Sequence, residues 1–178
     1  MTSKEEEARL KVSNLLRTDG FESFLVWFPM KEVTERRLGH CEVTGKPLLP
    51  GYIFIFWEGD REIDFPFHKI RRVPGVIRIL EYDDGTHNLK GKDMEYAKWI
   101  HMHDGFIRQS KVIYRPGQKL HITEGPLKGF DGNVIKVDKH HKRITLMFEL
   151  GEIRNEVSFT VEFLNTSSTT DAPDKSRF

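Results

Sequence analysis

Residues 117–135 read GQKLHITEGPLKGFDGNVI, and the pattern of this stretch decides the fold of the C-terminal part of the chain. Apolar and polar residues alternate over Lys119–Thr123, which is the period of a half-buried strand. Gly125-Pro126 then predicts a turn, and Gly129 and Gly132 allow a second bend before the apolar run resumes. The stretch therefore predicts two strands joined by a compact, glycine-rich connection.

Composition limits the class of protein. The chain has 178 residues, enough for one or two small domains. Lys and Arg number 28 and Asp and Glu 27, so any basic surface that binds nucleic acid must be local. No apolar run is long enough to cross a membrane, and the single cysteine, Cys41, excludes an internal disulfide. We expect a soluble, monomeric protein of a reducing cytoplasm.

The first third of the sequence predicts one helix followed by extended segments. Ser3 and Glu6 have the spacing of a capping box, and Gly20 ends the helix that follows. After it, we expect a strand at 24–28, an exposed strand or hairpin arm around Val33, a loop at 39–47 and a strong strand at 48–57. The last strand places alternate residues on two faces, Tyr52, Phe54 and Phe56 on one and Ile53, Ile55 and Trp57 on the other.

The rest of the sequence predicts mixed elements, then a β unit. We expect a short helix within 61–72, a strand ending near Leu80 and a helix at 91–102. Residues 104–115 have no clear pattern and are expected to form a flexible linker. A barrel-like β unit follows at 116–164, and the Ser-, Thr-, Asp- and Pro-rich residues 165–178 are expected to form a disordered tail.

Two stretches together resemble a known family. Leu49–Phe54 (LPGYIF), followed by Val73–Val76 (VPGV), resembles the N-terminal (NGN) domain of NusG-family transcription elongation factors. Residues 117–135 resemble the KOW motif of transcription and translation proteins. The KOW resemblance rests on Gly117, Gly125, Pro126, Gly129 and Gly132.

The resemblance covers residues 3–164 and implies an α+β fold in two domains. The NGN domain, 1–103, would have an antiparallel sheet flanked by helices. The linker, 104–115, would lead to a small SH3-like β-barrel, the KOW domain, at 116–164. Family members begin with a strand before the first helix, whereas Met1–Ser3 leads directly into it. We therefore expect the first strand to be missing and an apolar sheet edge to be exposed.

The resemblance also implies a docking site for RNA polymerase. In the family, an apolar surface around Pro-Gly-Tyr contacts the coiled-coil tip of the polymerase clamp. The expected docking residues here are Leu49, Tyr52 and Phe54. Stiff aromatic side chains suit this role because they bury a large area at low entropic cost. The alternative is that this aromatic ladder is ordinary core.

A basic segment points to nucleic acid. Between Asp64 and Glu81 the sequence has no acidic residue, and such a one-signed patch favours an anionic partner. The resemblance places this region beside a nascent RNA hairpin or the non-template DNA strand. The expected binding residues are His68, Lys69, Arg71, Arg72 and Arg78, extended by Lys31, Arg36 and Arg37. The alternative is a solvated helix face.

Enzyme and metal chemistry have no support in the sequence. Lys136–Arg143 predicts a basic hairpin tip, and His140 and His141 within it lack Cys or carboxylate partners at ligand spacing. We expect no metal and no cofactor. The chain also lacks a phosphate-binding Gly loop with a Lys, a Ser nucleophile elbow and a His-Glu-x-x-His motif. It is therefore expected to be a binding protein.

Taken as a family member, the chain would be an elongation and antitermination factor acting in specific operons. Gly125–Gly129 and Ile135–Arg143 are most similar to the LoaP-type paralogues, which promote antitermination in long biosynthetic operons. One alternative is the general NusG role, with the KOW domain contacting Rho or the ribosome. Another is an RNA-binding, ribosome-associated KOW protein, although an RNA-only module has no need of a large apolar face. The sequence leaves open whether RNA or DNA is read and whether the KOW domain switches fold.

Overall fold

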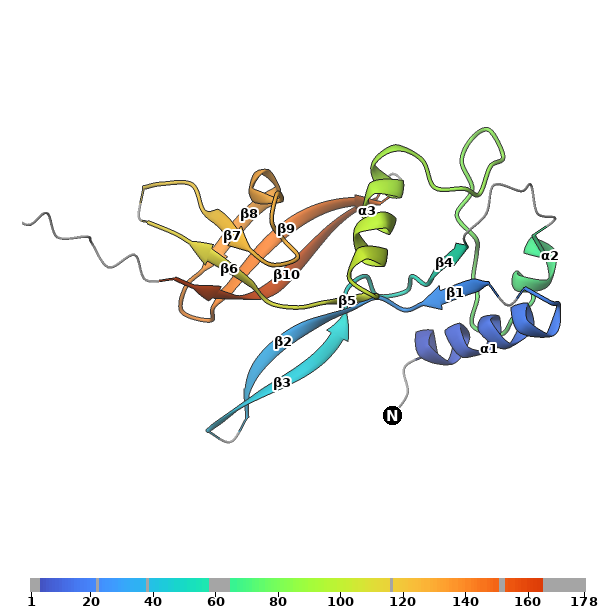
Figure 1. The fold of residues 1–178 in the computed structure, drawn as a ribbon, viewed down its shortest axis with the longest axis horizontal. Coiled ribbons are helices and arrows are strands. Elements are labelled where there is room, and N and C mark those ends of the chain that lie inside the picture. The colour runs from blue at the N-terminus through green and yellow to red at the C-terminus, as the bar shows by residue number, and fades with distance from the viewer. Residues whose placement is uncertain are drawn as a thin grey trace, which may run out of the picture.

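The computed structural model describes residues 4–21, 23–37, 39–57, 65–115, 117–150 and 153–164, with only the backbone described at 36 and 37. Its three helices are α1 (Lys4–Thr18), α2 (Phe67–Ile70) and α3 (Gly91–Met102). In Figure 1, a five-stranded sheet occupies one end of the molecule and α1 and α2 the other, with α3 between them.

Helix α1 packs on a two-stranded sheet. In this sheet β1 (Phe24–Trp27) pairs antiparallel with β4 (Phe54–Trp57). Ala8, Val12 and Leu16 recur every four residues along α1 and are buried, as expected of a helix with one apolar stripe. They meet the face of β1 that also contacts α2. The opposite face of the sheet, with Trp27, Phe54 and Phe56, packs against a second core.

A protruding hairpin forms the second sheet. β2 (Met30–Arg37) pairs antiparallel with β3 (His40–Pro47), and β5 (Phe106–Ile107) adds to β2 in parallel, so the strand order is β3-β2-β5. Figure 1 shows the hairpin extending below the five-stranded sheet. β2 is thus the central strand of its sheet.

The third sheet has the strand order β7-β6-β10-β9-β8. Its strands are β6 (Ser110–Ile113), β7 (His121–Glu124), β8 (Val134–Asp138), β9 (Arg143–Leu150) and β10 (Ile153–Phe163), with the short 3₁₀ helix η1 (Asp131–Asn133) before β8. β10 pairs in parallel with β6 and antiparallel with β9. Alternate residues of β9 are buried, which is the pattern of a strand with one face on a core.

One large core joins this sheet to α3 and β4. It includes Phe54 of β4, Trp99 and Ile100 of α3, and Phe148 of β9. The indole Nε1 of Trp99 donates a hydrogen bond to the carbonyl oxygen of Pro126 at 2.8 Å. Residues expected to lie in two separate domains therefore contribute to a single core.

Several predicted elements are confirmed. The helix at 91–102 is α3, and α1 ends at Thr18, just before Gly20. The Lys136–Arg143 tip joins β8 and β9. The strand expected at 48–57 is shorter, because only Phe54–Trp57 forms β4. Its two faces still separate, since Tyr52, Phe54 and Phe56 join the large core and Ile53 and Ile55 the α1 core, while Trp57 is exposed.

Other predictions are corrected. Residues 39–47, expected as a loop, contain β3, because their polar backbone pairs along the whole of β2. The expected linker, 104–115, contains β5 and β6, which pair with strands distant in sequence. The expected strand ending near Leu80 forms no ladder among the described residues, and the helix expected within 61–72 is described only at Phe67–Ile70. Ser3 and 165–178 lie outside the described residues.

Candidate functional site

The face of the β1–β4 sheet that turns away from α1 carries an aromatic cluster. The Trp27 and Phe56 ring centroids lie 5.1 Å apart, and the imidazole of His101 lies 5.1 Å from the first and 5.2 Å from the second. Leu25 lies beside Phe56 in the register and is 46% exposed. Tyr52 and Phe56 are half-buried. We call Leu25, Trp27, Tyr52 and Phe56 the aromatic face.

The predicted docking set is only partly at this surface. Leu49 and Phe54 are each 6% exposed, whereas Tyr52 is half-buried. Leu49 is covered because it packs in the large core with residues of α3, β9 and β10. The ladder was expected either to dock a partner or to be core, and here Phe54 is core whereas Tyr52 and Phe56 are half-buried. Leu25 and Trp27 were not predicted, and Phe56 was predicted on the ladder but not in the docking set. The cross-strand pairing of β1 with β4 brings these three residues together.

The basic segment at 68–78 is partly neutralised by carboxylates from outside it. Lys69 Nζ lies 2.7 Å from Asp19 Oδ2 at the end of α1, and Arg71 Nη2 lies 3.0 Å from Glu81 Oε2. The side chains of His68, Arg72 and Arg78 are exposed and have no such partner within the described ranges. The absence of acidic residues between 65 and 80 therefore does not make every cation in the segment free.

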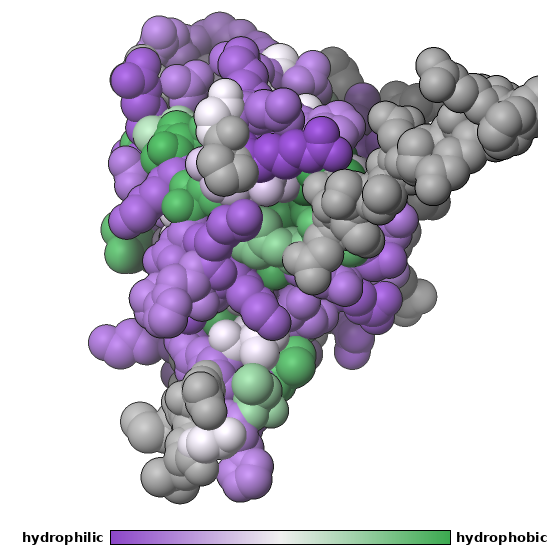
Figure 2. Space-filling model, turned by 90° about the vertical axis from the view of Figure 1, so that its left-hand side faces the viewer, coloured by the Kyte–Doolittle hydropathy of each residue, from purple (hydrophilic) through white to green (hydrophobic). Residues whose placement is uncertain are grey.

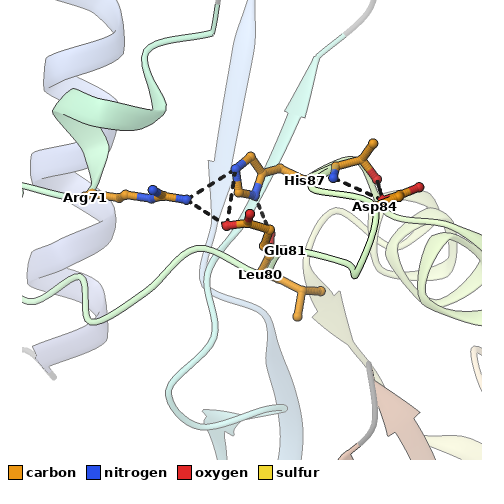
Figure 3. Close-up of polar contacts among 6 residues, drawn as sticks. Arg71, Leu80, Glu81, Asp84 and His87 are labelled. Atoms are coloured by element: carbon orange, nitrogen blue, oxygen red, sulfur yellow. Dashed lines mark hydrogen bonds and ion pairs between the residues drawn. The ribbon is translucent and has the colours of Figure 1, made fainter.

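Besides Glu81, the Arg71 guanidinium also contacts His87, and nothing in the sequence predicts this contact. Figure 3 shows the His87 ring between Arg71 and the Leu80–Glu81 backbone. Nδ1 of His87 lies 2.7 Å from the carbonyl oxygen of Leu80, and Nε2 lies 3.4 Å from Arg71 Nη2. With the proton on Nδ1, Nε2 accepts from the guanidinium. The Phe67 ring, 4.2 Å away, covers the imidazole.

The side chain of Asp84 stabilises the loop that carries His87. Asp84 Oδ1 accepts hydrogen bonds from the Thr86 backbone N–H at 3.1 Å and from its hydroxyl at 2.7 Å, and Asp84 also pairs with Lys90. The Lys90 ammonium and these two donors lower the pKa of the Asp84 carboxyl. Such a side-chain turn fixes a loop without secondary structure.

The three remaining predicted cations lie on the β2–β3 hairpin. Lys31 is half-buried and stands over the Phe159 ring of β10, with its Nζ 5.4 Å from the ring centroid. Arg36 and Arg37 belong to β2, and their side chains lie outside the described part. The predicted nucleic-acid residues therefore fall into two groups, one in the 68–78 segment and one on the hairpin. Within the hairpin, Lys31 lies against β10, whereas Arg36 and Arg37 lie at the turn end of β2.

The KOW-like stretch forms a turn that packs against β6 and α3. Gly125 has φ +95°, and a Cβ built there would lie 2.7 Å from Ser110 Oγ. The Leu127 N–H donates to the same Ser110 Oγ at 3.0 Å, and Pro126 accepts from Trp99. Gly117 and Gly129 also have positive φ, whereas Gly132 does not. These residues shape and anchor the turn.

The described residues offer neither a metal site nor a membrane-spanning helix. No group of three or more His, Cys, Asp and Glu side chains there could hold a metal ion. None of the described helices has the length and apolar character needed to cross a membrane.

Comparison with known proteins identifies the family. The family described as "Transcription termination factor nusG" matches residues 1–97. The chain belongs to the NusG family. It is 26% identical over 161 residues to the transcription termination/antitermination protein NusG of Thermus thermophilus, covering 83% of this chain and 84% of that protein. It is also 26% identical over 129 residues to the NusG of Campylobacter jejuni, covering 71% of each.

Family membership sets the general activity. The chain is a NusG-like factor of transcription termination or antitermination, and the family consists of transcription factors that act with RNA polymerase, not of enzymes. The match to residues 1–97 includes α1, the aromatic face and the 68–78 segment. The aromatic face and the 68–78 segment therefore both lie within the residues that match the family.

Proposed function

We propose that this chain docks on the clamp of RNA polymerase through its aromatic face and contacts nucleic acid, and that it suppresses pausing and termination in specific operons. The observation that carries the docking proposal is the partly exposed cluster of Leu25, Trp27, Tyr52 and Phe56 in a chain of the NusG family. Protein interfaces usually have rigid aromatic groups at their centre and a more polar, hydrated rim around them.

The structure refines which residues would make the contact. Phe54 and Leu49 support the surface from below, so their replacement would damage the core before it altered docking. Tyr52 and Phe56 have accessible edges and are the proposed anchors. Tyr52 also carries a hydroxyl, which suits the boundary between an apolar patch and solvent.

The KOW-like sheet is proposed to be an SH3-like barrel that recruits a second partner. Support comes from the five strands β6–β10 and from the glycine turn at 125–129. Its position next to α3 would hold that partner close to the transcribing polymerase, which raises its effective concentration. Rho and the ribosome are the partners for a general NusG role.

Operon-restricted action of the LoaP type and the general role are separable. The general role is favoured by the relatives, which are named transcription termination/antitermination protein NusG. The restricted role is favoured by residues 125–129 and 135–143, on which the LoaP resemblance rests. Genome-wide occupancy distinguishes them, because a general factor follows polymerase over most transcribed genes and a restricted one is confined to few operons.

The docking proposal is tested by pull-down of RNA polymerase with the full chain and with Tyr52→Ala. We expect the wild-type chain to retain polymerase and Tyr52→Ala to retain clearly less, with an unchanged melting curve. A wild-type chain that retains only RNA or ribosomes would replace the proposal with the RNA-binding alternative.

A further inference from the structure

Three cations meet where the β2–β3 hairpin crosses the five-stranded sheet. Lys31 and Lys46 are direct cross-strand partners in the β2–β3 ladder. The Lys31 ammonium also reaches the Phe159 ring of β10, at 5.4 Å from its centroid. Arg143 begins β9 and lies opposite Thr160, the residue after Phe159. Lys31, Lys46 and Arg143 are called the junction cations below.

Their charge is not balanced locally. Lys46 pairs with Glu35, but Lys31 and Arg143 have no ion-pair partner among the residues that the structure describes. Burial, followed by the charges of Lys46 and Arg143, lowers the pKa of Lys31 to about 8. Like charges placed directly opposite one another in a sheet are destabilising. The junction cations therefore form a site at which an anion would relieve repulsion.

Hydrogen bonds hold this arrangement in place. The Thr34 N–H donates to Thr160 Oγ1 at 3.3 Å, and Gln109 Nε2 donates to Thr34 Oγ1 at 2.6 Å. The first bond ties β2 to β10 at Thr160, the partner of Arg143, and the second ties β2 to the connection between β5 and β6. Because the strands are fixed, the cations do not need to be brought together when a ligand binds, which lowers the cost of binding.

We propose that the junction cations bind a backbone phosphate of single-stranded nucleic acid, so that the strand bridges the hairpin and the five-stranded sheet. The proposal rests on the nucleic-acid contact of the proposed function and assigns it to this junction. Lys and Arg together suit a phosphate, since Arg supplies a planar pair of donors and Lys a compact charge.

A polyanion fits the junction better than a single anion does. Lys139 and Lys142 are exposed in the tip that leads away from Arg143, so cations continue along a strip. Figure 2 views the end of the molecule that carries the hairpin and the sheet, and hydrophilic side chains predominate there. A groove of successive cations is the usual way to follow a single strand without reading its sequence. By contrast, Lys69 and Arg71 near α2 already have carboxylate partners.

The test compares three full-length variants that each lose one positive charge: Lys31→Met, Arg143→Met and the control Lys92→Met. Met keeps the aliphatic stem of Lys31 against Phe159, and the control residue Lys92, in the first turn of α3, pairs with Glu149 near the other end of β9 from Arg143. The probe is a fluorescein-labelled oligothymidylate titrated at several salt concentrations in phosphate-free buffer. We expect each junction variant to bind at least about threefold more weakly and to lose about 0.7 of the log–log salt slope, with the control unchanged.

A second readout follows Lys31 itself by the chemical shift of its ε carbon. Oligothymidylate should raise the midpoint of the Lys31 titration, because a phosphate nearby favours the charged amine. The proposal is overturned if Lys92→Met weakens binding as much as Lys31→Met, if the Lys31 titration does not move, or if the chain binds anionic phosphatidylserine vesicles and not the oligonucleotide. Polymerase pull-down with the same variants separates the two proposals, since junction variants should still dock.

Discussion

At Gly125 the backbone has φ +95°, and a Cβ would meet Ser110 Oγ at 2.7 Å and Ser110 Cα at 2.8 Å. Gly125→Ala therefore combines a strained backbone with a clash against another strand. We expect a loss of about 3 kcal/mol or more in the free energy of unfolding. Gly129→Ala is the matched control, because Gly129 has φ +94° but open space, and should lose only about 1–2 kcal/mol. Equal losses in denaturant titrations would show that the contact with Ser110 does not matter.

The pKa of Lys31 predicts a pH dependence of stability. Its folded pKa is lowered to about 8 from 10.5, so the unfolded chain binds more protons between these values. The free energy of unfolding of the wild type should therefore rise with pH over this window, relative to that of Lys31→Met, because the half-buried Lys31 amine loses its unfavourable charge. We expect Lys31→Met to be the more stable below pH 8, by on the order of 1 kcal/mol after solvent screening, and the advantage to fade by about pH 10.5. A constant difference between urea titrations at the two pH values would contradict the lowered pKa.

At the scale of elements, the β2–β3 hairpin contains a buried hydroxyl that lacks a hydrogen-bond partner within the described structure. Thr44 Oγ1 in β3 is buried and, within the described structure, has no hydrogen-bond partner. Thr44→Val keeps the β-branched shape and removes the unsatisfied hydroxyl, so we expect stabilisation by about 1 kcal/mol. Val43→Thr is the control, since Val43 is 62% exposed and its replacement should change little. Destabilisation by Thr44→Val in thermal melts would mean that the hydroxyl has a partner after all.

The elements that the sequence predicts well are those with their own periodicity. α1 and α3 repeat apolar residues at helical spacing, and successive side chains of the 52–57 ladder point to opposite faces. In each case the pattern itself predicts which face is buried. β3 reads HCEVTGKP and has no such alternation, because only its pairing with β2 makes it a strand. β6 pairs with β10 through residues 51 positions further along the chain, such as Ser110 with Val161, and local pattern does not report such a partner.

The same distinction explains the outcome for the candidate sites. The ladder was correctly placed on two faces, but the burial of Leu49 and Phe54 depends on α3 and the five-stranded sheet. The 68–78 segment is acid-free in sequence, yet Asp19 and Glu81 reach it in space. His87 gave no signal because its role depends on the fold bringing Leu80 and Arg71 to its two nitrogens.

At the scale of the whole molecule, the central proposal is that the chain docks on RNA polymerase through the aromatic face. It rests on membership of the NusG family and on the partial exposure of that face. The affinity of polymerase for the full chain, Phe56→Ala and the control Ile135→Ala tests it most directly. Ile135 is 49% exposed on β8, away from the aromatic face, so the control removes a comparable apolar group from another surface. We predict that Phe56→Ala weakens binding by roughly 2 kcal/mol while the melting curve keeps its cooperativity, and that Ile135→Ala binds as the wild type does. Unchanged affinity of Phe56→Ala, or an equal loss in Ile135→Ala, would contradict the account.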